Sequence, residues 1–438
     1  MKKLGLSVIL FALTAFTLSA ADKVVLTWWT WSIPTVEDFV IIKKGFEAKY
    51  PNIELQSSVS QMDAYKTKLQ AEFSSGAGPD ILCVQPGSLL SQYKPFLLDL
   101  TKPAKATLDK LVPSLVADAK LRSGGDAISM APLGSASTMF IYYNATYFEK
   151  AGITKLPTDL ATLKDAMAKL KKAYPDKLPL TIGLKDGWFN GDVFSLFSNM
   201  VEKGITEKAD AGKIKWNDAK FVKAMTLLKT LVDQGVIDKN SLGVSVYEDS
   251  IGMWADGKAA MHINGGWAIG MLSNPKNVNE SGKPYADRRG GRATDGDVFG
   301  AFPVPNFAGG KPVVLGGIDV GIAVNKNLSK NPAKLDAAMK LLDYMLVGEG
   351  RTYQTGRPGA GLIPSLKGVS LDKSIYQDKA SADGVDAIVN TTNLNMAGPR
   401  GVASPAVFTQ MGVVVQNVVA GKDIKTELDA LQAVADKE

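Results

Sequence analysis

An α/β fold that begins with parallel strands is predicted by the first third of the chain. Segments typical of strands alternate with helical patterns from Val24 to about Tyr143. Residues 53–59 alternate in polarity as a half-buried strand does, and residues 81–84 form the continuous apolar run of a strand covered on both faces. A β-α-β-α-β order of this kind places parallel strands in one sheet, with helices on both faces.

The individual elements are predicted from side-chain periodicity. Strands are expected at residues 24–27, 53–59, 81–84, 259–263, 299–305 and 319–324. Apolar residues that recur every three or four positions predict helices at about residues 36–46, 65–73, 160–170, 221–232, 332–345, 405–418 and 424–434. Asn331-Pro332 and Ser404-Pro405 each place a proline in the first turn of a helix. The polar composition between Ser273 and Gly300 predicts a solvated loop or linker.

Composition excludes several kinds of chemistry. The chain has one Cys and one His, which rules out an internal disulfide, a thiolate metal cluster and a His-rich zinc site. Cys83 and His262 lie in apolar, strand-like segments, and we expect both to be packed in the core. The formal charge is +6, or 6 − 2 = +4 without Lys2 and Lys3, and no Lys/Arg block occurs. Nucleic acid is therefore not an expected partner, and no metal or cofactor is expected.

Residues 1–20 are predicted to be a signal peptide. A basic pair, Lys2-Lys3, precedes an apolar stretch over residues 4–18, and small residues favour cleavage near Ala20 or Ala21. The apolar stretch is too short for a stable transmembrane anchor, and the cleavage region lacks the Cys that lipid attachment requires. We therefore expect an exported protein whose location is the periplasm of a double-membraned bacterium.

Three of the seven tryptophans, Trp28, Trp29 and Trp31, cluster at the end of the first predicted strand. Large rings at this position either fill a core or contact a flat, partly apolar ligand, and strand ends are where ligands bind in open α/β sheets. Successive strand side chains alternate in direction, so at least one of Trp28 and Trp29 should be in the core. The cluster predicts one stacking ring, either Trp29 or Trp31.

The sequence lacks four common catalytic and nucleotide-binding motifs, and Ser-x-x-Lys matches at residues 91–94 and 273–276 have no partner motif. We find no phosphate-binding loop, no dinucleotide-binding glycine motif after a strand, no nucleophile elbow and no His-Glu-x-x-His. Carboxylates are the one catalytic resource left, since a glycosidase needs only two. Five of them lie near predicted loops, but the sequence alone cannot bring two together: Asp63, Asp80, Asp186, Asp249 and Asp319.

Aromatic and short polar side chains occur together at other element ends. Trp188 follows Asp186-Gly187, Trp254 precedes Asp256, and Trp267 follows Asn264 and two glycines. This combination suits a sugar, because a ring can stack on the apolar C–H face while polar groups bind the hydroxyls. For Trp188 we slightly favour core packing, whereas for Trp267 we favour ligand contact.

Four segments of the chain, taken in order, form a recognisable pattern: residues 46–53, residues 68–81 with Gly78-Pro79-Asp80-Ile81, residues 142–152, and residues 257–267. The last segment, Gly257-Lys258-Ala259-Ala260-Met261-His262-Ile263-Asn264-Gly265-Gly266-Trp267, is the most specific. In these segments the chain resembles the extracellular solute-binding proteins of bacterial ABC sugar importers, and the resemblance covers nearly all of the mature chain.

This resemblance implies a two-lobed periplasmic-binding-protein fold of type II, in which each lobe is a sheet flanked by helices. One lobe would contain residues 22–137 and 300–345, and the other residues 138–299 and 346–438. The ligand would bind in the cleft between the lobes, which would close over it. The implied function is sugar capture by a monomer that delivers its ligand to an ABC permease, without enzymatic activity.

The resemblance also implies where the ligand contacts lie. They are the opening tryptophans with Gln61 and Asp63, the loop with Gln85, Gly87 and Ser88, then Trp267, residues 316–319 with Asp319, Arg357, and finally Arg400. Trp188, Trp254 and Asn264 join them as candidates from their own surroundings. The loop after Cys83-Val84 has no aromatic ring, which argues against a long maltodextrin-like ligand.

Alternatives remain open at this point. Arg357 and Arg400 could clasp the carboxylate of an acidic sugar, or they could form surface salt bridges. A carbohydrate-active enzyme with paired carboxylates and a binder of a non-sugar solute are the competing functions.

Overall fold

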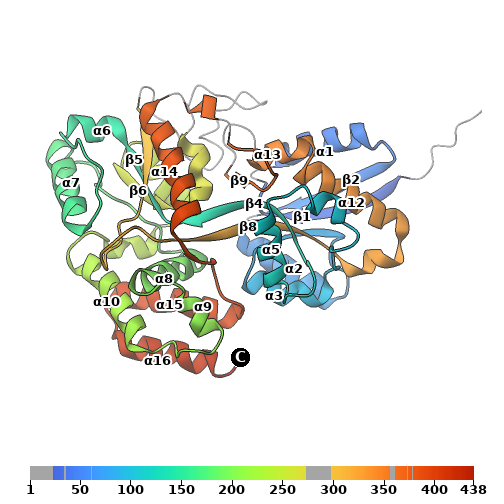
Figure 1. Ribbon diagram of the computed structural model, residues 1–438. Coiled ribbons are helices and arrows are strands. Elements are labelled where there is room, and N and C mark those ends of the chain that lie inside the picture. Colours follow the sequence, from blue (N-terminus) through green and yellow to red (C-terminus); the bar gives the residue numbers. More distant parts are fainter. Residues whose placement is uncertain are drawn as a thin grey trace, which may run out of the picture.

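Two sheets of unequal size, each flanked by helices, organise the protein (Figure 1). The computed structural model describes residues 23–33, 36–60, 62–272, 297–355, 361–371, 373–376 and 378–438. One sheet has seven strands and the other has three. We call the seven-stranded sheet with its helices the large-sheet lobe, and the three-stranded sheet with its helices the small-sheet lobe.

The large sheet has the strand order β2-β1-β3-β8-β4-β9, with β10 pairing with β8. Its strands are β1 (Val24–Thr30), β2 (Ile53–Val59), β3 (Ile81–Val84), β4 (Ala131–Thr138), β8 (Val314–Val324), β9 (Ile363–Pro364) and β10 (Met396–Gly398). Strand β1 is parallel to β2 and β3, as the sequence predicts. Strand β8 instead runs antiparallel to β3 and β4, a direction that periodicity does not encode.

The small sheet has the order β6-β5-β7, and both pairings are antiparallel. Its strands are β5 (Phe140–Asn144), β6 (Met261–Asn264) and β7 (Phe299–Pro303). Strand β7 therefore belongs to the small-sheet lobe, although it begins at the position where the sequence suggests a return to the other lobe. Strand β9 pairs with β4 in the large sheet, so residues 363–364 lie with the large-sheet lobe.

Helices cover both sheets (Figure 1). Those of the large-sheet lobe are α1 (Val36–Lys49), α2 (Met62–Ser74), α3 (Ser88–Tyr93), α4 (Lys105–Leu108), α5 (Pro113–Arg122), α12 (Pro332–Leu346) and α13 (Thr352–Thr355). Those of the small-sheet lobe are α6 (Ala145–Lys150), α7 (Leu160–Ala173), α8 (Gly187–Val201), α9 (Ile205–Asp210), α10 (Ala219–Asp233), α11 (Ile251–Ala255), α14 (Lys379–Asn395), α15 (Pro405–Ala420) and α16 (Ile424–Ala435). None of the helices described is both long and apolar enough to cross a membrane.

The two predicted proline-led helix starts are confirmed. Asn331 accepts a hydrogen bond from the Lys334 N–H at the start of α12, and Ser404 accepts one from the Val407 N–H at the start of α15. In both cases the capping side chain binds a backbone N–H that has no partner within the helix. The predicted polar loop between Ser273 and Gly300 lies mostly outside the described residues.

The opening strand divides its tryptophans between two faces of the sheet. Trp28 is fully buried, and its ring centroid lies 6.0 Å from that of Phe39 on α1. Trp29, next along the strand, is half-buried and lies beneath the ammonium group of Lys68 on α2, at 3.9 Å from Nζ to the ring centroid. The expected core position is thus filled by Trp28.

Asp80 of the Pro-Asp-Ile segment connects three elements of the large-sheet lobe. One oxygen of its carboxylate accepts hydrogen bonds from the Thr27 N–H at 2.9 Å and the Thr27 hydroxyl at 3.0 Å. The ammonium group of Lys334 on α12 lies 2.9 Å from the same oxygen. These bonds give Asp80 a structural role, since they tie the start of β3 to β1 and to α12.

The core of the small-sheet lobe contains Trp254 and His262. Trp254 is 1% exposed, and its ring packs against Tyr142, His262 and Phe299 at centroid distances of 6.0, 6.1 and 4.5 Å. The expectation that Trp254 contacts a ligand is therefore corrected: it is a core residue. His262 is also buried, and its Nδ1 lies 2.8 Å from the Ser250 hydroxyl.

Burial lowers the pKa of His262 to about 3, because the charged imidazolium would lose its hydration. The unfolded chain has a His pKa of about 6.5. Between these values the unfolded state takes up a proton that the folded state does not. His262 therefore costs stability as the pH falls from about 6.5 toward 3, with a slope of at most about 1.4 kcal/mol per pH unit.

We expect His262→Gln, whose amide can still bind Ser250, to flatten this acid-side decline. Urea unfolding at pH 6, 5 and 4 should show that the variant loses less unfolding free energy than the parent, by up to about 1.4 kcal/mol per pH unit. Ser250→Ala retains the imidazole and should keep the steep slope. Parallel pH profiles for the parent and His262→Gln would contradict this account.

Candidate functional site

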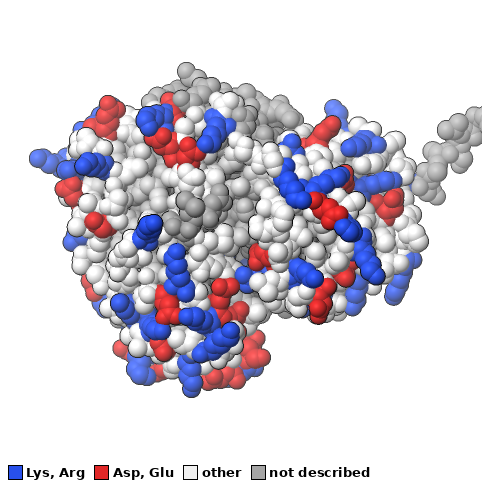
Figure 2. All heavy atoms as spheres, viewed as in Figure 1, with Lys and Arg blue, Asp and Glu red and all other residues white. Residues whose placement is uncertain are grey.

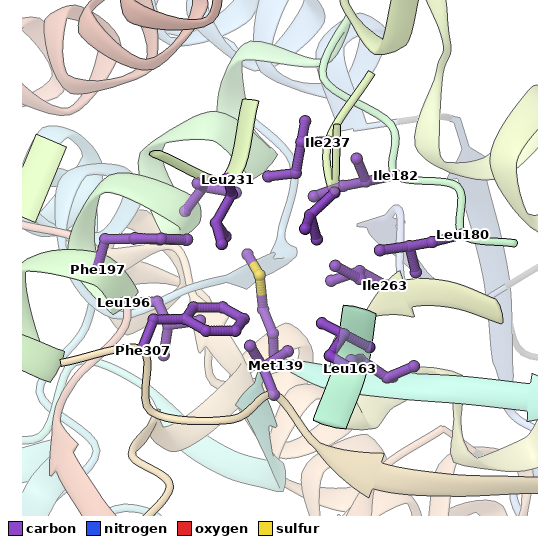
Figure 3. Close-up of a pocket in the computed structure, with 14 residues that line it drawn as sticks. Met139, Leu163, Leu180, Ile182, Leu196, Phe197, Leu231, Ile237, Ile263 and Phe307 are labelled. Carbon is purple, nitrogen blue, oxygen red and sulfur yellow. The ribbon is translucent and has the colours of Figure 1, made fainter. Parts of the chain in front are cut away.

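An apolar cavity lies inside the small-sheet lobe (Figure 3). Its lining side chains come from α7, α8, α10, β5, β6 and the neighbouring loops. They include Met139, Leu196, Phe197, Leu231, Ile263 and Phe307. All fourteen lining residues are apolar. A ligand site needs at least a few polar groups to orient its ligand, so we interpret this cavity as a packing gap in the core.

A second pocket lies between the two lobes and has a different chemistry. It measures about 530 Å³, counted out to its open mouth. The large-sheet lobe contributes Met62, Lys66, Gln85, Pro86, Ser88, Leu89, Ile318 and Asp319, and the small-sheet lobe contributes Trp188, Asp192 and Phe408. Arg400 and Gly401 lie on the segment that connects β10 of the large sheet to α15 of the small-sheet lobe. Aromatic rings, an amide, a hydroxyl and charges of both signs therefore converge on one space, which makes this pocket the candidate site.

Strand ends of the large sheet deliver its polar groups to the pocket. Gln85 and Ser88 follow the carboxyl end of β3, and Asp319 lies on the antiparallel β8, just beyond its pairing with Val84 of β3. Gly87, between them, has φ of +90°. A Cβ at Gly87 would also lie 3.0 Å from the Val402 carbonyl oxygen of the other lobe. Glycine is required here because the two lobes approach each other backbone to backbone.

A buried ion-pair cluster crosses the pocket. Arg400, in the segment between β10 and α15, donates to the Asp192 carboxylate on α8 at 2.8 Å and to the Asp319 carboxylate on β8. The side chains of Asp192, Asp319 and Arg400 are 2%, 9% and 14% exposed. Since Asp192 belongs to the small-sheet lobe and Asp319 to the large-sheet lobe, with Arg400 on the segment that connects them, the cluster joins the lobes.

Burial and charge act against each other in this cluster. Burial raises the pKa of the Asp192 carboxyl, and the nearby Arg400 guanidinium opposes that rise. Burial also disfavours the charged form of Arg400, but Asp192 and Asp319 outweigh it and raise the pKa of Arg400. The guanidinium is thus held charged between two carboxylates. Within the described part of the chain, its Nε–H has no hydrogen-bond partner.

An aromatic group surrounds Arg400 on the small-sheet lobe. The guanidinium carbon lies 4.1 Å from the centroid of the Trp267 ring. The Trp188 ring lies 6.0 Å from that of Trp267 and stacks at 6.0 Å on Tyr247, which belongs to a short π-helix, Val246–Ser250. Trp267 is 4% exposed, whereas Trp188 is half-buried and faces the pocket.

Five of the residues predicted from the sequence come together here: Gln85, Ser88, Trp188, Asp319 and Arg400. The sequence slightly favours core packing for Trp188, but in the structure this ring lines the pocket. Trp267 lies behind Arg400 and is not among the lining residues.

Other predicted residues lie elsewhere. Trp29 contacts Lys68, and the Trp31 ring packs 5.0 Å from that of Tyr65, so neither ring lines the pocket. Asn264 is fully buried, and its Oδ1 accepts a hydrogen bond from the Gly265 N–H at 2.8 Å. Gln61, Arg357 and the side chain of Asp63 fall outside what the structure describes.

Sequence reasoning missed several pocket residues, of which Asp192 and Phe408 matter most. Asp192 lies in α8, where every residue from Phe189 to Met200 is buried. A lone carboxylate inside such a helix needs a buried partner, and this signal could have been recognised. Phe408 follows the apolar periodicity of α15, which makes it indistinguishable from a core residue in the sequence.

Comparisons with known proteins agree with this architecture. Residues 42–383 match the family described as bacterial extracellular solute-binding protein. An uncharacterized ABC transporter extracellular-binding protein of Pyrococcus horikoshii is 25% identical over 416 residues, which cover 91% of this chain and 83% of the relative. The multiple sugar-binding protein of Streptococcus mutans serotype c is 25% identical over 340 residues, covering 76% of this chain and 73% of the relative.

Solved structures show the same fold. A chitin oligosaccharide binding protein superposes with a TM-score of 0.73 at 24% identity, over 95% of this chain and 99% of that one. A solute-binding protein in complex with raffinose gives a TM-score of 0.70 at 19% identity, over 95% and 99% of the two chains. The protein therefore belongs to the bacterial extracellular solute-binding proteins and has their two-lobed α/β fold.

Proposed function

We propose that this protein is the sugar-capturing component of a bacterial ABC importer and that its ligand binds in the pocket between the lobes. The observation that carries the proposal is the composition of that pocket. Trp188 and Phe408 offer apolar ring surface, while Gln85, Ser88 and the Arg400 cluster offer hydrogen-bonding groups. A sugar has both an apolar C–H face and a rim of hydroxyls, and this pocket can contact both.

The division of these groups between the lobes supports capture by closure. Gln85, Ser88 and Asp319 belong to the large-sheet lobe, and Trp188 and Phe408 belong to the small-sheet lobe. A ligand that bonds to both sets is bound more tightly when the lobes are together, so it shifts the population toward the closed state. The closed form would then dock, as a monomer, on membrane permease subunits.

Location and lobe boundaries complete the proposal. The predicted signal peptide, residues 1–20, would direct the chain to the periplasm, and cleavage would leave no lipid-attachment Cys. The lobes would follow the division expected from the sequence, 22–137 with 300–345 and 138–299 with 346–438. Three shifts follow from strand pairing, since β7 pairs within the small sheet, whereas β9 and β10 pair within the large one.

A neutral sugar fits the pocket better than an acidic one. Arg400 already donates to two carboxylates, so a third, from the ligand, would compete with Asp192 and Asp319. The formal charges that line the pocket balance, with Lys66 and Arg400 opposite these two carboxylates. Of the two roles left open for Arg400, internal ion pairing is the one we favour. The pairing is buried rather than on the surface.

An enzyme with paired carboxylates is less well supported. Asp192 and Asp319 share one guanidinium, and a carboxylate held in this way is poorly placed to protonate a leaving group. Among the other candidates, Asp186 accepts from the Val246 N–H at 2.7 Å and Asp249 bonds to Ser245 at 2.9 Å. On the face shown in Figure 2, positive and negative side chains are interspersed, so no basic surface favours nucleic acid there.

The first test is a binding screen with purified mature protein. Maltose, raffinose and chitin oligosaccharides are suitable first probes, with an amino acid and a polyamine as the non-sugar arms. Ligand at 100 times its dissociation constant should add about 2.7 kcal/mol of stability in a thermal-shift assay. Reducing ends released during incubation would point to the enzyme, and stabilisation by only the non-sugar probes would overturn sugar capture.

Trp188→Ala should weaken sugar binding about tenfold, or ~1.4 kcal/mol, because the pocket loses a stacking surface. Trp31→Ala is the matched control, since Trp31 is also half-buried but lies outside the pocket. Its affinity should stay within about twofold of the parent in calorimetric titration. If Trp31→Ala weakens binding and Trp188→Ala does not, the ligand site lies at the end of β1 instead.

We expect a uronic acid to bind at least tenfold more weakly than the neutral sugar from which it differs by one carboxylate. In Asp192→Asn, Arg400 loses one charged partner, so the ratio of the two dissociation constants should shift toward the uronic acid. Competition calorimetry measures that ratio directly. Tighter binding of the uronic acid by the parent protein would contradict the assignment of a neutral ligand.

A further inference from the structure

Trp267 is well placed in sequence to stack on a sugar, but its ring is already occupied. A Cβ at Gly265 would lie 2.1–2.3 Å from three atoms of the six-membered ring, so the glycine backbone packs directly on it. The Arg400 guanidinium lies over the ring at 4.1 Å. With 4% of its surface exposed, Trp267 leaves no ring face open to a ligand.

Arg400 is therefore held from three directions. Asp192 and Asp319 bind its terminal nitrogens, and Trp267 lies under the plane of the guanidinium. Ion pairing alone leaves a planar group free to tilt about the line between its partners. An aromatic ring against its face removes that freedom, and the attraction between cation and ring is strongest where water is excluded.

We propose that Trp267 is a positioning residue for sugar recognition, which acts by fixing the Arg400 guanidinium rather than by touching the ligand. This rests on the proposed function and deepens it. The fixed guanidinium aims its unpartnered Nε–H and holds Asp192 and Asp319 in one arrangement across the lobes. Polar recognition of the ligand thus depends on a ring that stays behind the pocket wall.

A double-mutant cycle separates positioning from direct stacking. Trp267→Leu keeps apolar volume but removes the ring face, and Arg400→Lys keeps the charge but removes the planar fork. The probe is whichever of maltose, raffinose and N,N′-diacetylchitobiose binds the parent protein most tightly. We expect Trp267→Leu to weaken binding on the order of tenfold in the parent but less than twofold in the Arg400→Lys background. Trp267→Phe should restore most of the loss.

An equal loss from Trp267→Leu in both backgrounds would overturn the proposal, because a stacking ring does not need Arg400. Unchanged affinity in Trp267→Leu would overturn it as well. The unfolding midpoint of each variant is measured alongside. If the Leu variant is unstable, Trp267→Phe still decides the question. A ring that positions Arg400 predicts near-parental affinity for Trp267→Phe alone. In the Arg400→Lys background, Trp267→Phe should bind the sugar no more tightly than Trp267→Leu.

A second readout needs no sugar and so stands apart from the proposed function. In the ligand-free protein, the side-chain ¹⁵N–H signal of Arg400 should show an upfield ring-current shift from Trp267. The shift should disappear in Trp267→Leu and persist in Trp188→Ala. If no sugar probe binds, the proposed function is wrong, but this measurement still tests the contact between Trp267 and Arg400. If the chemical shift of the Arg400 signal is unchanged in Trp267→Leu, Trp267 does not position Arg400 and the proposal is wrong.

Discussion

The guanidinium of Arg400, between carboxylates from both lobes, is the interaction on which the site depends. Asp192 is nearly completely buried in α8, and Asp319 is nearly so on β8. Neither charge could remain there without a cation, because an unpaired buried carboxylate is strongly destabilising. Arg400 satisfies both with one planar group, which a lysine could not do with the same geometry. This cluster of three charged residues also explains why Trp267, Trp188 and Tyr247 lie together here, since their rings shield it from water.

Two other contacts between the lobes, among the residues that the structure describes, are weaker or purely steric. Arg122 of α5 reaches Glu207 of α9 at 3.4 Å, but the Glu207 side chain is 46% exposed and that of Arg122 is 23% exposed, so water weakens this pair. The close approach of Gly87 to Val402 sets the distance between these two backbone segments, but it adds no ion pair or hydrogen bond. Among the described residues, the buried cluster is therefore the strongest ion pairing that crosses the pocket. A ligand that enters must add its hydrogen bonds to this link, which makes lobe geometry and ligand recognition parts of one network.

The sequence predicts the elements well and the site in part. The alternation of patterns identifies β1, β2 and β3 as parallel strands, and prolines mark the starts of α12 and α15. The direction of β8 does not follow from periodicity, because a strand looks the same in either direction. The tryptophans show the same limit. Alternation separates Trp28 from Trp29, but only tertiary packing decides that Lys68 covers Trp29, that Arg400 covers Trp267 and that Trp188 faces the pocket.

Binding of a sugar between the lobes, around Arg400, should change the amide hydrogen exchange of the protein when the tightest-binding sugar is added. We expect new protection in three segments that meet at the pocket: residues 85–89, 188–192 and 398–402. Protection confined to the end of β1 and the start of α1, with no change in those three segments, would contradict it and return the site to the tryptophan cluster.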